Sequence, residues 1–491
     1  MNVMTKANKI RLSISLYLNY FVHGIGLLIL TQNMRPLSSE WGTSIATVSY
    51  VISGVGIGRL LAYYLLGSLS DRIGRKKIIL FGMISYSIFF IGILLTKDFK
   101  VAYLLAILAG VANSALDSGT YPTFLEMNRN NGAASILIKA AMSIGEFVLP
   151  LYIGLNENLG GWYGLSFIFA AALLLINAAL ISRSQFPLQV KPEKTEQHRL
   201  FTKGKLSKTK VGLVAILSLY GYTSMAVMIL FTQWITLYGI DVLHMSNMQA
   251  HFLLSLYSVG SIVGVLIVFT ILKSALVKEG TLMVIMNGLS LLFLLTVCFS
   301  SNHLSVTVAS FFFGVTAAGG IMQVGLTIFS SMFPHAKGRV TAIFFSFGSI
   351  ASFTVPIFTG LLSTSGTAYA LRSDLVIASF SFVLWIIGHR LLSLSNDQTG
   401  YETERSQINF IDYWILKLLQ WRFKLAKSIG MKKMNQGQQV LDPFREKEII
   451  SRIDQRVKDH ENRDHYQEIF QTILTNSKQC QTNLQEKGRV K

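Results

Sequence analysis

The feature that most limits the fold of this chain is a series of long apolar runs in its first 392 residues. Each has about 19 residues or more, the length that an α-helix needs to cross a bilayer. Because backbone polar groups in lipid must be bonded internally, such runs fold as spanning helices. The sequence therefore predicts an all-α, twelve-span membrane protein, with spans near positions 12–33, 44–66, 78–96, 101–123, 133–155, 161–182, 211–238, 247–272, 281–300, 303–328, 339–363 and 371–392.

Composition and the placement of charge agree with this interpretation. Of the 491 residues, 51% are hydrophobic and only 14% are charged, which is typical of a membrane protein. An even number of spans puts both ends on one side. If that side is the cytoplasm, the basic residues of the outer loops are Arg35, Lys97, Lys100 and Arg372. Since Lys and Arg concentrate in cytoplasmic loops, we expect both termini to be cytoplasmic.

A basic loop at 183–210 divides the spans into two sets of six. The halves show weak internal similarity, because the Gly-Val-Ala that begins at Gly110 resembles the Gly-Val-Thr that begins at Gly314. A repeat of six spans is typical of a transporter built from two bundles. The expected organisation is a first bundle at 1–182, the loop at 183–210, a second bundle at 211–392, a linker at 393–401 and a tail domain at 402–486.

The loop between the second and third spans resembles the signature loop of the major facilitator superfamily. Its matching residues are Gly67, Asp71, Arg72, Gly74 and Arg75. In that family the loop belongs to the conformational gate. The stretch 113–122 also resembles bacterial inner-membrane carriers that have been linked to shikimate or quinate. The resemblance implies a carrier of a small organic anion in the bacterial inner membrane.

Ionisable residues inside spans are functional candidates, since each costs about 2.5 to 3.5 kcal/mol to insert. Those that stand out are Arg59, Asp117, Lys139 and Glu146, all in the first half. One hypothesis is that a cation attracts an anionic substrate and a carboxylate carries a coupling proton. The alternative is that these charges neutralise each other as a structural or gating network. Weaker candidates in the cavity-lining spans of the superfamily are His23, Asn113, Gln233 and Gln323.

The tail reads as three amphipathic helices. Asp442 and Pro443 are typical of a helix start, because Asp caps free amides and Pro at the first position has no amide. Ser477 and Gln481 stand four apart and lie on one face of the third helix. The tail offers cations, carboxylates, a hydroxyl and an amide, but no nucleophile with a partnered base and no metal-ligand cluster. We therefore expect a site for a dianion, without metal, cofactor or nucleic acid.

This arrangement resembles the all-helical, AroQ-type chorismate mutase domain, and the matching positions are Arg405, Arg422, Lys433, Asp442, Arg445, Glu446, Ser477 and Gln481. The resemblance implies the rearrangement of chorismate to prephenate, a unimolecular step catalysed by positioning and charge stabilisation. The roles that it implies are a carboxylate clamp for Arg405 and Arg422, ether-oxygen bonding for Lys433 and Gln481, orientation of the ring hydroxyl for Glu446 with Asp442 and Arg445, and carboxylate support for Ser477.

Helix geometry adds a prediction about assembly. Arg405 and Arg422 are 17 positions apart (422 − 405), which is about 26 Å along one helix. They cannot share one small substrate within a protomer. If both bind chorismate, Arg405 must come from a partner, so we expect a homodimer through the tail.

The whole sequence thus predicts a bifunctional protein. A secondary transporter of a shikimate-pathway or related organic anion, with proton coupling, is fused to a chorismate mutase of aromatic amino acid biosynthesis. One alternative is a non-catalytic tail that binds chorismate or an aromatic amino acid and regulates transport. Another is a carrier for an unrelated sugar or drug. The eight competent residue types in the tail favour the enzyme.

Overall fold

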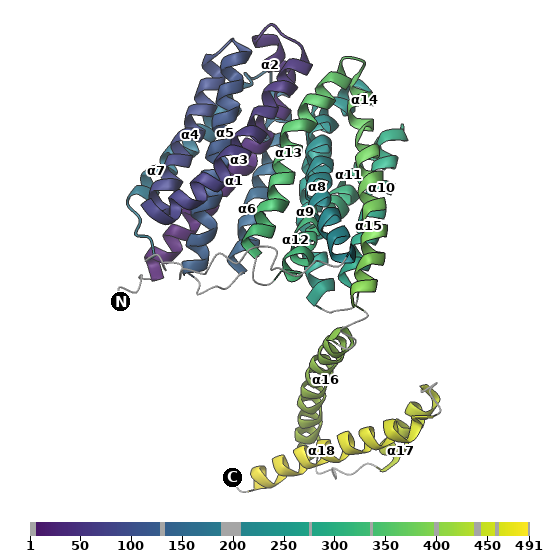
Figure 1. Cartoon of the computed structure of the whole chain (residues 1–491). Coiled ribbons are helices and arrows are strands. Elements are labelled where there is room, and N and C mark those ends of the chain that lie inside the picture. Colours follow the sequence, from purple (N-terminus) through teal and green to yellow (C-terminus); the bar gives the residue numbers. More distant parts are fainter. Residues whose placement is uncertain are drawn as a thin grey trace. The chain divides into compact units, whose positions relative to one another are not determined.

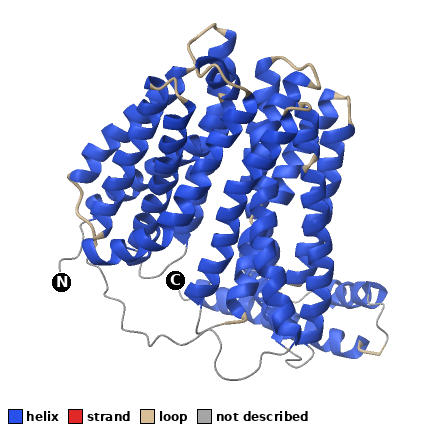
Figure 2. Cartoon of the chain, turned by 45° about the horizontal axis from the view of Figure 1, so that its top comes forward, coloured by secondary structure: helices blue, strands red, loops and turns tan. Residues whose placement is uncertain are grey.

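The computed structural model describes residues 6–127, 133–187, 208–273, 277–333, 337–396, 402–436, 443–456 and 461–489. The chain forms two compact units, Met1–Gly400 and Tyr401–Lys491. The regular structure of the described residues is helical in both units (Figures 1 and 2). The predicted all-α fold is therefore confirmed. Most of the loop predicted at 183–210 lies outside the described residues, as does Asp442.

The first unit contains twelve helical segments that are long and apolar enough to cross a membrane, as predicted. The first half consists of α1 (Lys6–Gln32), α2 (Met34–Glu40), α3 (Ile45–Ile73), α4 (Arg75–Leu95), α5 (Phe99–Met127), α6 (Ala133–Asn158) and α7 (Gly164–Ser182). The second half consists of α8 (Lys208–Asp241), α9 (Asn247–Lys273), α10 (Glu279–Phe299), α11 (His303–Phe313), η1 (Gly314–Ala318), α12 (Ile321–Ser331), α13 (Lys337–Ser363), α14 (Thr367–Arg372) and α15 (Asp374–Asn396).

The tenth span is not the continuous helix that its apolar run predicts. It changes to a π-helical turn at η1, and Gly320 then adopts a left-handed φ of 91° before α12 begins. Ser261 of α9 donates to the Ala318 carbonyl at 3.2 Å, which satisfies a backbone group that the break releases. The interruption depends on a glycine conformation and on a neighbouring helix, so hydropathy alone does not reveal it.

Close helix packing repeats between the two halves. A Cβ on Gly110 of α5 would lie 2.2 Å from the Val55 carbonyl oxygen of α3. A Cβ on Gly314 of η1 would lie 2.1 Å from the Tyr257 carbonyl oxygen of α9. Small residues permit such close backbone contact in membrane bundles. The two glycines that the sequence repeat aligns therefore have the same packing role.

The two bundles meet where α3 packs on α13 and α6 packs on α9. Among the described residues, hydrogen bonds between the bundles gather toward the end of the unit where α3 begins and α13 ends, here called the far end. Ser49 of α3 donates to the Pro356 carbonyl of α13 at 2.5 Å. His251 of α9 lies 2.9 Å from Gln32 of α1 through Nδ1 and 3.4 Å from Glu157 of α6 through Nε2. These contacts hold the far end together.

The second unit has three helices, α16 (Glu402–Asn435), α17 (Pro443–Arg456) and α18 (Arg463–Arg489). Helix α18 packs on both α16 and α17. Among the described side chains of this unit, only Ala426, Gly430 and Ser477 are buried. Six apolar residues of α16 are 49% or more exposed, namely Ile408, Ile411, Ile415, Leu418, Leu425 and Ile429. One copy of the tail therefore does not bury its own apolar face.

Candidate functional sites

The tail site centres on a contact between α16 and α18. Arg422 donates through Nη1 to the Ser477 hydroxyl, and also to the Ile473 carbonyl at 3.4 Å. Ser477 is 6% exposed and in turn donates to the Ile473 carbonyl at 2.7 Å. Burial lowers the pKa of Arg422 from its ordinary value, but guanidinium is so basic that the side chain stays charged. The structure thus brings two of the predicted site residues together.

Gln481 lies one turn beyond Ser477 on α18 and packs against α16. A Cβ on Gly430 of α16 would be 3.0 Å from Gln481 Cγ, which is tighter than most side-chain contacts. The glycine therefore lets α18 approach α16 at this position. Lys433, almost one turn further along α16, is half-buried. The sequence reasoning did not single out Gly430.

Glu446 of α17 is joined to α18 by a residue that the sequence reasoning also missed. Lys478 Nζ lies 3.0 Å from one carboxylate oxygen of Glu446 and 3.2 Å from the other. Lys478 directly follows Ser477, so one turn of α18 holds both Arg422 of α16 and Glu446 of α17. The only sequence signal for it was a cation next to a predicted site residue.

Arg445 of α17 pairs with an acidic residue on its own helix. It donates to Glu448 at 2.5 Å, and Arg452 donates to the other oxygen of the same carboxylate at 2.5 Å. The hydrogen bond from Arg445 is the main reason why the pKa of Glu448 is lowered. Arg405 lies on α16 but its side chain is outside the described residues, as is all of Asp442.

Helix α16 is continuous from Glu402 to Asn435, so Arg405 and Arg422 do lie on one helix. Their separation of 17 positions is therefore about 26 Å along the axis. A chorismate-sized ligand bound at Arg422 cannot reach Arg405 of the same protomer.

The gate loop of the membrane unit is a compact polar cluster. Gly74 has a φ of 104°, which only glycine adopts readily, and so allows the sharp break between α3 and α4. Arg75 lies 2.5 Å from Asp71 and 3.3 Å from Glu126 at the end of α5. Ser70 donates to the Ser118 carbonyl at 2.9 Å. Of the other residues in the motif, Arg72 is exposed and Gly67 approaches Ser118.

The charged residues inside the spans form separate contacts. Tyr20 donates to Asp117 at 2.5 Å, and Lys139 lies 3.8 Å from Glu146 on the same helix, α6. The buried Arg59 Nε has no hydrogen-bond partner among the described residues.

The weaker polar candidates have different surroundings. His23 is buried, with its ring centroid 5.3 Å from that of Tyr20, and Asn113 is buried on α5. Gln233 of α8 donates to Ser49 at 2.5 Å and so joins the contacts between the bundles. The side chain of Gln323 is exposed.

Asp374 is a buried carboxyl that the sequence reasoning missed. It begins α15, is fully buried, and neither of its carboxyl oxygens has a hydrogen-bond partner among the described residues. It lies near the start of the predicted span 371–392, two residues after Arg372.

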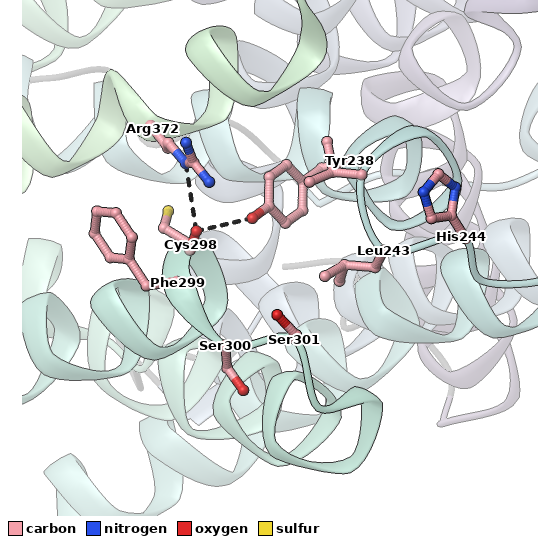
Figure 3. Close-up of a pocket in the computed structure, with 9 residues that line it drawn as sticks. Tyr238, Leu243, His244, Cys298, Phe299, Ser300, Ser301 and Arg372 are labelled. Carbon is pink, nitrogen blue, oxygen red and sulfur yellow. Dashed lines mark hydrogen bonds between the residues drawn. The ribbon is translucent and has the colours of Figure 1, made fainter.

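A pocket of about 350 Å³ lies within the second half (Figure 3). Tyr238 and Arg372 both donate to the Cys298 carbonyl in its wall, at 2.9 and 3.4 Å, and the Arg372 guanidinium lies 5.3 Å from the Phe299 ring centroid. None of the predicted transport candidates lines this pocket, so it is separate from them.

Comparison with known proteins identifies a family for each of the two units. Residues 16–279 match the Major Facilitator Superfamily, and residues 404–482 match Chorismate mutase type II. The chain is 42% identical to the inner membrane transport protein YdiM of Escherichia coli (strain K12) over 376 residues, which are 76% of this chain and 92% of YdiM. It is 33% identical to YdiN of the same strain over 375 residues, 76% of this chain and 88% of YdiN.

A similar solved structure is that of a bacterial homologue of the human lysosomal transporter Spinster, in an inward-facing and occupied conformation. Its TM-score is 0.66 at 12% identity, over 79% of this chain and 98% of that one, so it supports the fold alone. The spans and the inner-membrane relatives together make this a multi-pass inner-membrane protein. The chain belongs to the Major Facilitator Superfamily, and its transporter is fused to a chorismate mutase type II domain.

Proposed function

We propose that the tail catalyses the conversion of chorismate to prephenate. The observation that carries the proposal is the contact of Arg422 with Ser477, one turn from Gln481. Arg422 makes its bonds to Ser477 and to the Ile473 carbonyl through Nη1, which leaves Nε and Nη2 to face a carboxylate of the substrate. The match of this unit to the chorismate mutase type II family supports the same assignment.

The rearrangement needs no proton transfer, so catalysis comes from holding the reactive conformer and stabilising charge at the breaking ether bond. In the proposed site Arg422 holds one carboxylate, while Lys433 and Gln481 bond the ether oxygen. Glu446 accepts from the ring hydroxyl. The partial burial that lowers the pKa of Arg422 also strengthens its interaction with a bound anion.

The proposed active enzyme is a homodimer through the tail. Arg405 is too far along α16 to reach a ligand at Arg422 of its own chain, so it serves the site of the partner subunit. The exposed apolar face of α16 supplies a surface for this pairing. Each site then contains the second guanidinium that a dicarboxylate needs.

The test is disappearance of chorismate with the purified full-length protein, beside an Arg422→Ala variant. We expect saturable turnover that falls by at least about 100-fold in the variant, as for loss of a preorganised charged donor. Arg452→Ala is a matched control, because Arg452 is an exposed guanidinium that pairs with Glu448 on α17. Absence of turnover in the unmodified protein would overturn the proposal, and turnover that survives Arg422→Ala would place the chemistry elsewhere.

A second candidate is a regulatory tail that binds chorismate or an aromatic amino acid without turnover. It is favoured by one observation, namely that Lys478 already contacts both carboxylate oxygens of Glu446. Calorimetric binding of chorismate without product, together with an effect of the ligand on transport, would support this candidate over the enzyme.

For the membrane unit we propose transport of a small organic anion of the shikimate-pathway type, coupled to protons. The buried Arg59 Nε without a partner in the described structure supports an anion site. Asp117 and Glu146 are the proposed proton carriers, and Lys139, 3.8 Å from Glu146, would favour the ionised form of that carboxyl.

Proton flux on addition of candidate anions should disappear in an Asp117→Asn, Glu146→Gln double variant. Flux that persists would leave these residues a structural role.

The proposed orientation places both termini and the tail in the cytoplasm, where chorismate is made and used. The far end then faces outward, because its loops carry few basic residues. Since hydrogen bonds between the bundles gather at this end, we infer an inward-facing conformation for the structure described.

A further inference from the structure

Helix α16 carries a second row of large exposed side chains. Ala426 and Gly430 are buried, and Gly430 marks the side that packs on α18. Successive residues of an α-helix advance by about 100°. Within positions 413–424, five residues fall at about 140° to 240° from Ala426, opposite this contact, and are here called the aromatic–lysine face. They are Tyr413, Trp414, Lys417, Trp421 and Lys424.

The aromatic–lysine face is open and internally ordered. Tyr413, Trp414 and Trp421 are 54%, 50% and 63% exposed, and both lysines are exposed. The rings of Tyr413 and Trp414 meet edge to face at 5.8 Å, and the Lys417 ammonium lies 5.7 Å from the Tyr413 ring centroid. Three large aromatic rings on one helix face are unusual for a surface that contacts only water.

This face is distinct from the apolar face proposed for dimerisation. The exposed apolar residues of that face fall between about −100° and 0° from Ala426, on a different side of the helix. They are Ile408, Ile411, Ile415, Leu418, Leu425 and Ile429. A second copy of the tail that covers them leaves the aromatic–lysine face uncovered, so dimerisation does not account for it.

The chemistry of the face fits the surface of a bilayer. Trp and Tyr prefer the headgroup region, where one side of the ring is apolar and the other is wet. Lys side chains near an anionic membrane surface are attracted to it. Between Thr403 and Asn435, no Asp or Glu of the sequence falls on this arc to oppose that attraction.

The connection to the last span keeps this face close to lipid. Helix α15 ends at Asn396 and α16 begins at Glu402, so five residues join them. Such a connection reaches at most about 20 Å when fully extended. The start of α16 is therefore held near lipid by the chain connection alone.

We propose that the aromatic–lysine face of α16 binds the bilayer surface. Its rings lie at the boundary between headgroups and acyl chains, and Lys417 and Lys424 lie among anionic headgroups. Helix α16 then runs along the membrane, with the side that carries Arg422 and contacts Ser477 turned toward the water. This interaction is independent of whether the tail turns over chorismate.

The test uses the full-length protein with Cys298→Ala and Cys480→Ser, and a single fluorescent label at Ser428→Cys. Ser428 is exposed and falls about 200° from Ala426, within the same arc. The matched control is a label at Thr475→Cys, which is exposed on α18. The protein is placed in nanodiscs of phosphatidylcholine with phosphatidylglycerol, and quenching by nitroxide-labelled lipid is compared with quenching by aqueous iodide.

We expect lipid nitroxide to quench the label at position 428 at least about twofold more than the label at 475, with the reverse order for iodide. Omitting phosphatidylglycerol or adding salt should weaken the difference, because the lysine attraction is screened. Equal iodide quenching at both positions would overturn the proposal. Protection of position 428 from both quenchers would also overturn it, since protein would then cover the face.

A variant experiment makes the result specific to the rings. Trp414→Glu with Trp421→Glu should abolish quenching of position 428 by lipid, whereas Trp414→Phe with Trp421→Phe should keep most of it. Thr472→Glu with Gln479→Glu adds the same charge to exposed positions of α18 and should change nothing. Far-ultraviolet circular dichroism checks that each variant keeps its helices. Lipid quenching that survives the two glutamates in a folded variant would contradict the proposal.

Discussion

The membrane unit and the tail are both helical, but they bury very different side chains. In the membrane unit Trp234, Trp385 and Tyr86 are fully buried within one chain. In the described tail the largest buried apolar side chain is Ala426. Exposed Leu and Ile are ordinary on the membrane unit because lipid surrounds it. On α16 the same exposure in water signals a missing partner.

The contrast teaches that exposed apolar surface has to be interpreted against its solvent. The membrane unit is complete as one chain, since its bundles bond to each other through residues such as Ser49 and His251. For the tail we propose two surroundings, a second tail on one face of α16 and lipid on another. Experiments that remove one surrounding at a time test whether both are needed.

The largest effect should come from the dimer face. Ile415→Glu with Leu418→Glu removes two apolar side chains per protomer, each contributing about 1.5 to 3 kcal/mol when buried. Four such losses in a dimer amount to at least about 6 kcal/mol, or about 10⁴-fold in the dissociation constant. We expect a monomer by mass photometry in detergent, with turnover of chorismate lost as well.

The control for this variant is Met431→Glu, which charges an exposed apolar residue of α16 outside the dimer face. It should leave both the dimer and turnover in detergent within about twofold, because single surface changes have small effects. A fully active monomer of the Ile415, Leu418 variant would show that the tail is as self-sufficient as the membrane unit.

Mixing two inactive variants sharpens the same point. Arg405→Ala and Arg422→Ala each remove one guanidinium from every site of a pure dimer. In a mixed dimer, one site contains both wild-type residues and the other contains neither. Random exchange gives half mixed dimers, so about one quarter of all sites, and about one quarter of wild-type turnover, should return.

The measurement is chorismate turnover after the two variants are coexpressed or unfolded and refolded together. Arg405→Ala mixed with itself is the control and should stay inactive. No recovery in a proven mixed dimer would show that both arginines act within one chain, contrary to the length of α16.

Sequence reasoning found features that local patterns carry. Apolar run length located the spans, and the Asp71, Arg72 and Gly74 pattern located the gate loop. It did not find Glu126, which meets Arg75 from 51 positions away, because nothing near either residue indicates the other. The break at η1 was hidden for the same reason, since it depends on packing against α9. The proposed site residues of the tail matched by type, while the partner Lys478 became visible only when α17 and α18 were seen together.

A smaller effect is expected from Lys478→Met, which removes the cation from Glu446 but keeps most of the side-chain volume. A partly exposed ion pair contributes about 0.2 to 1 kcal/mol, so kcat should fall by up to about fivefold, with KM less affected. Lys478→Arg should restore most of the loss. A rise in turnover would instead show that Lys478 holds Glu446 away from the substrate, which favours the regulatory tail.

The smallest effect concerns Glu448, where the tail stabilises itself without a partner. The hydrogen bond from Arg445, with the charges of Arg445 and Arg452, lowers the pKa of Glu448 in the folded state. When folding lowers the pKa of a Glu, its ionised form stabilises the folded state at pH values above the ordinary Glu pKa of about 4.3. This stabilisation is lost as the pH falls through the pKa of the folded state.

In thermal unfolding of residues 401–491 at pH 7, the melting temperature of Glu448→Gln should therefore be lower than that of the unmodified tail. The difference should be less than about 2 °C for so exposed a pair. The melting temperatures of these two tails should converge on acidification, as should that of Arg452→Gln, whereas Lys447→Gln on the same helix should show no such convergence. A deficit that grows on acidification would contradict this account, because it would mean that Glu448 stabilises the tail through its protonated form.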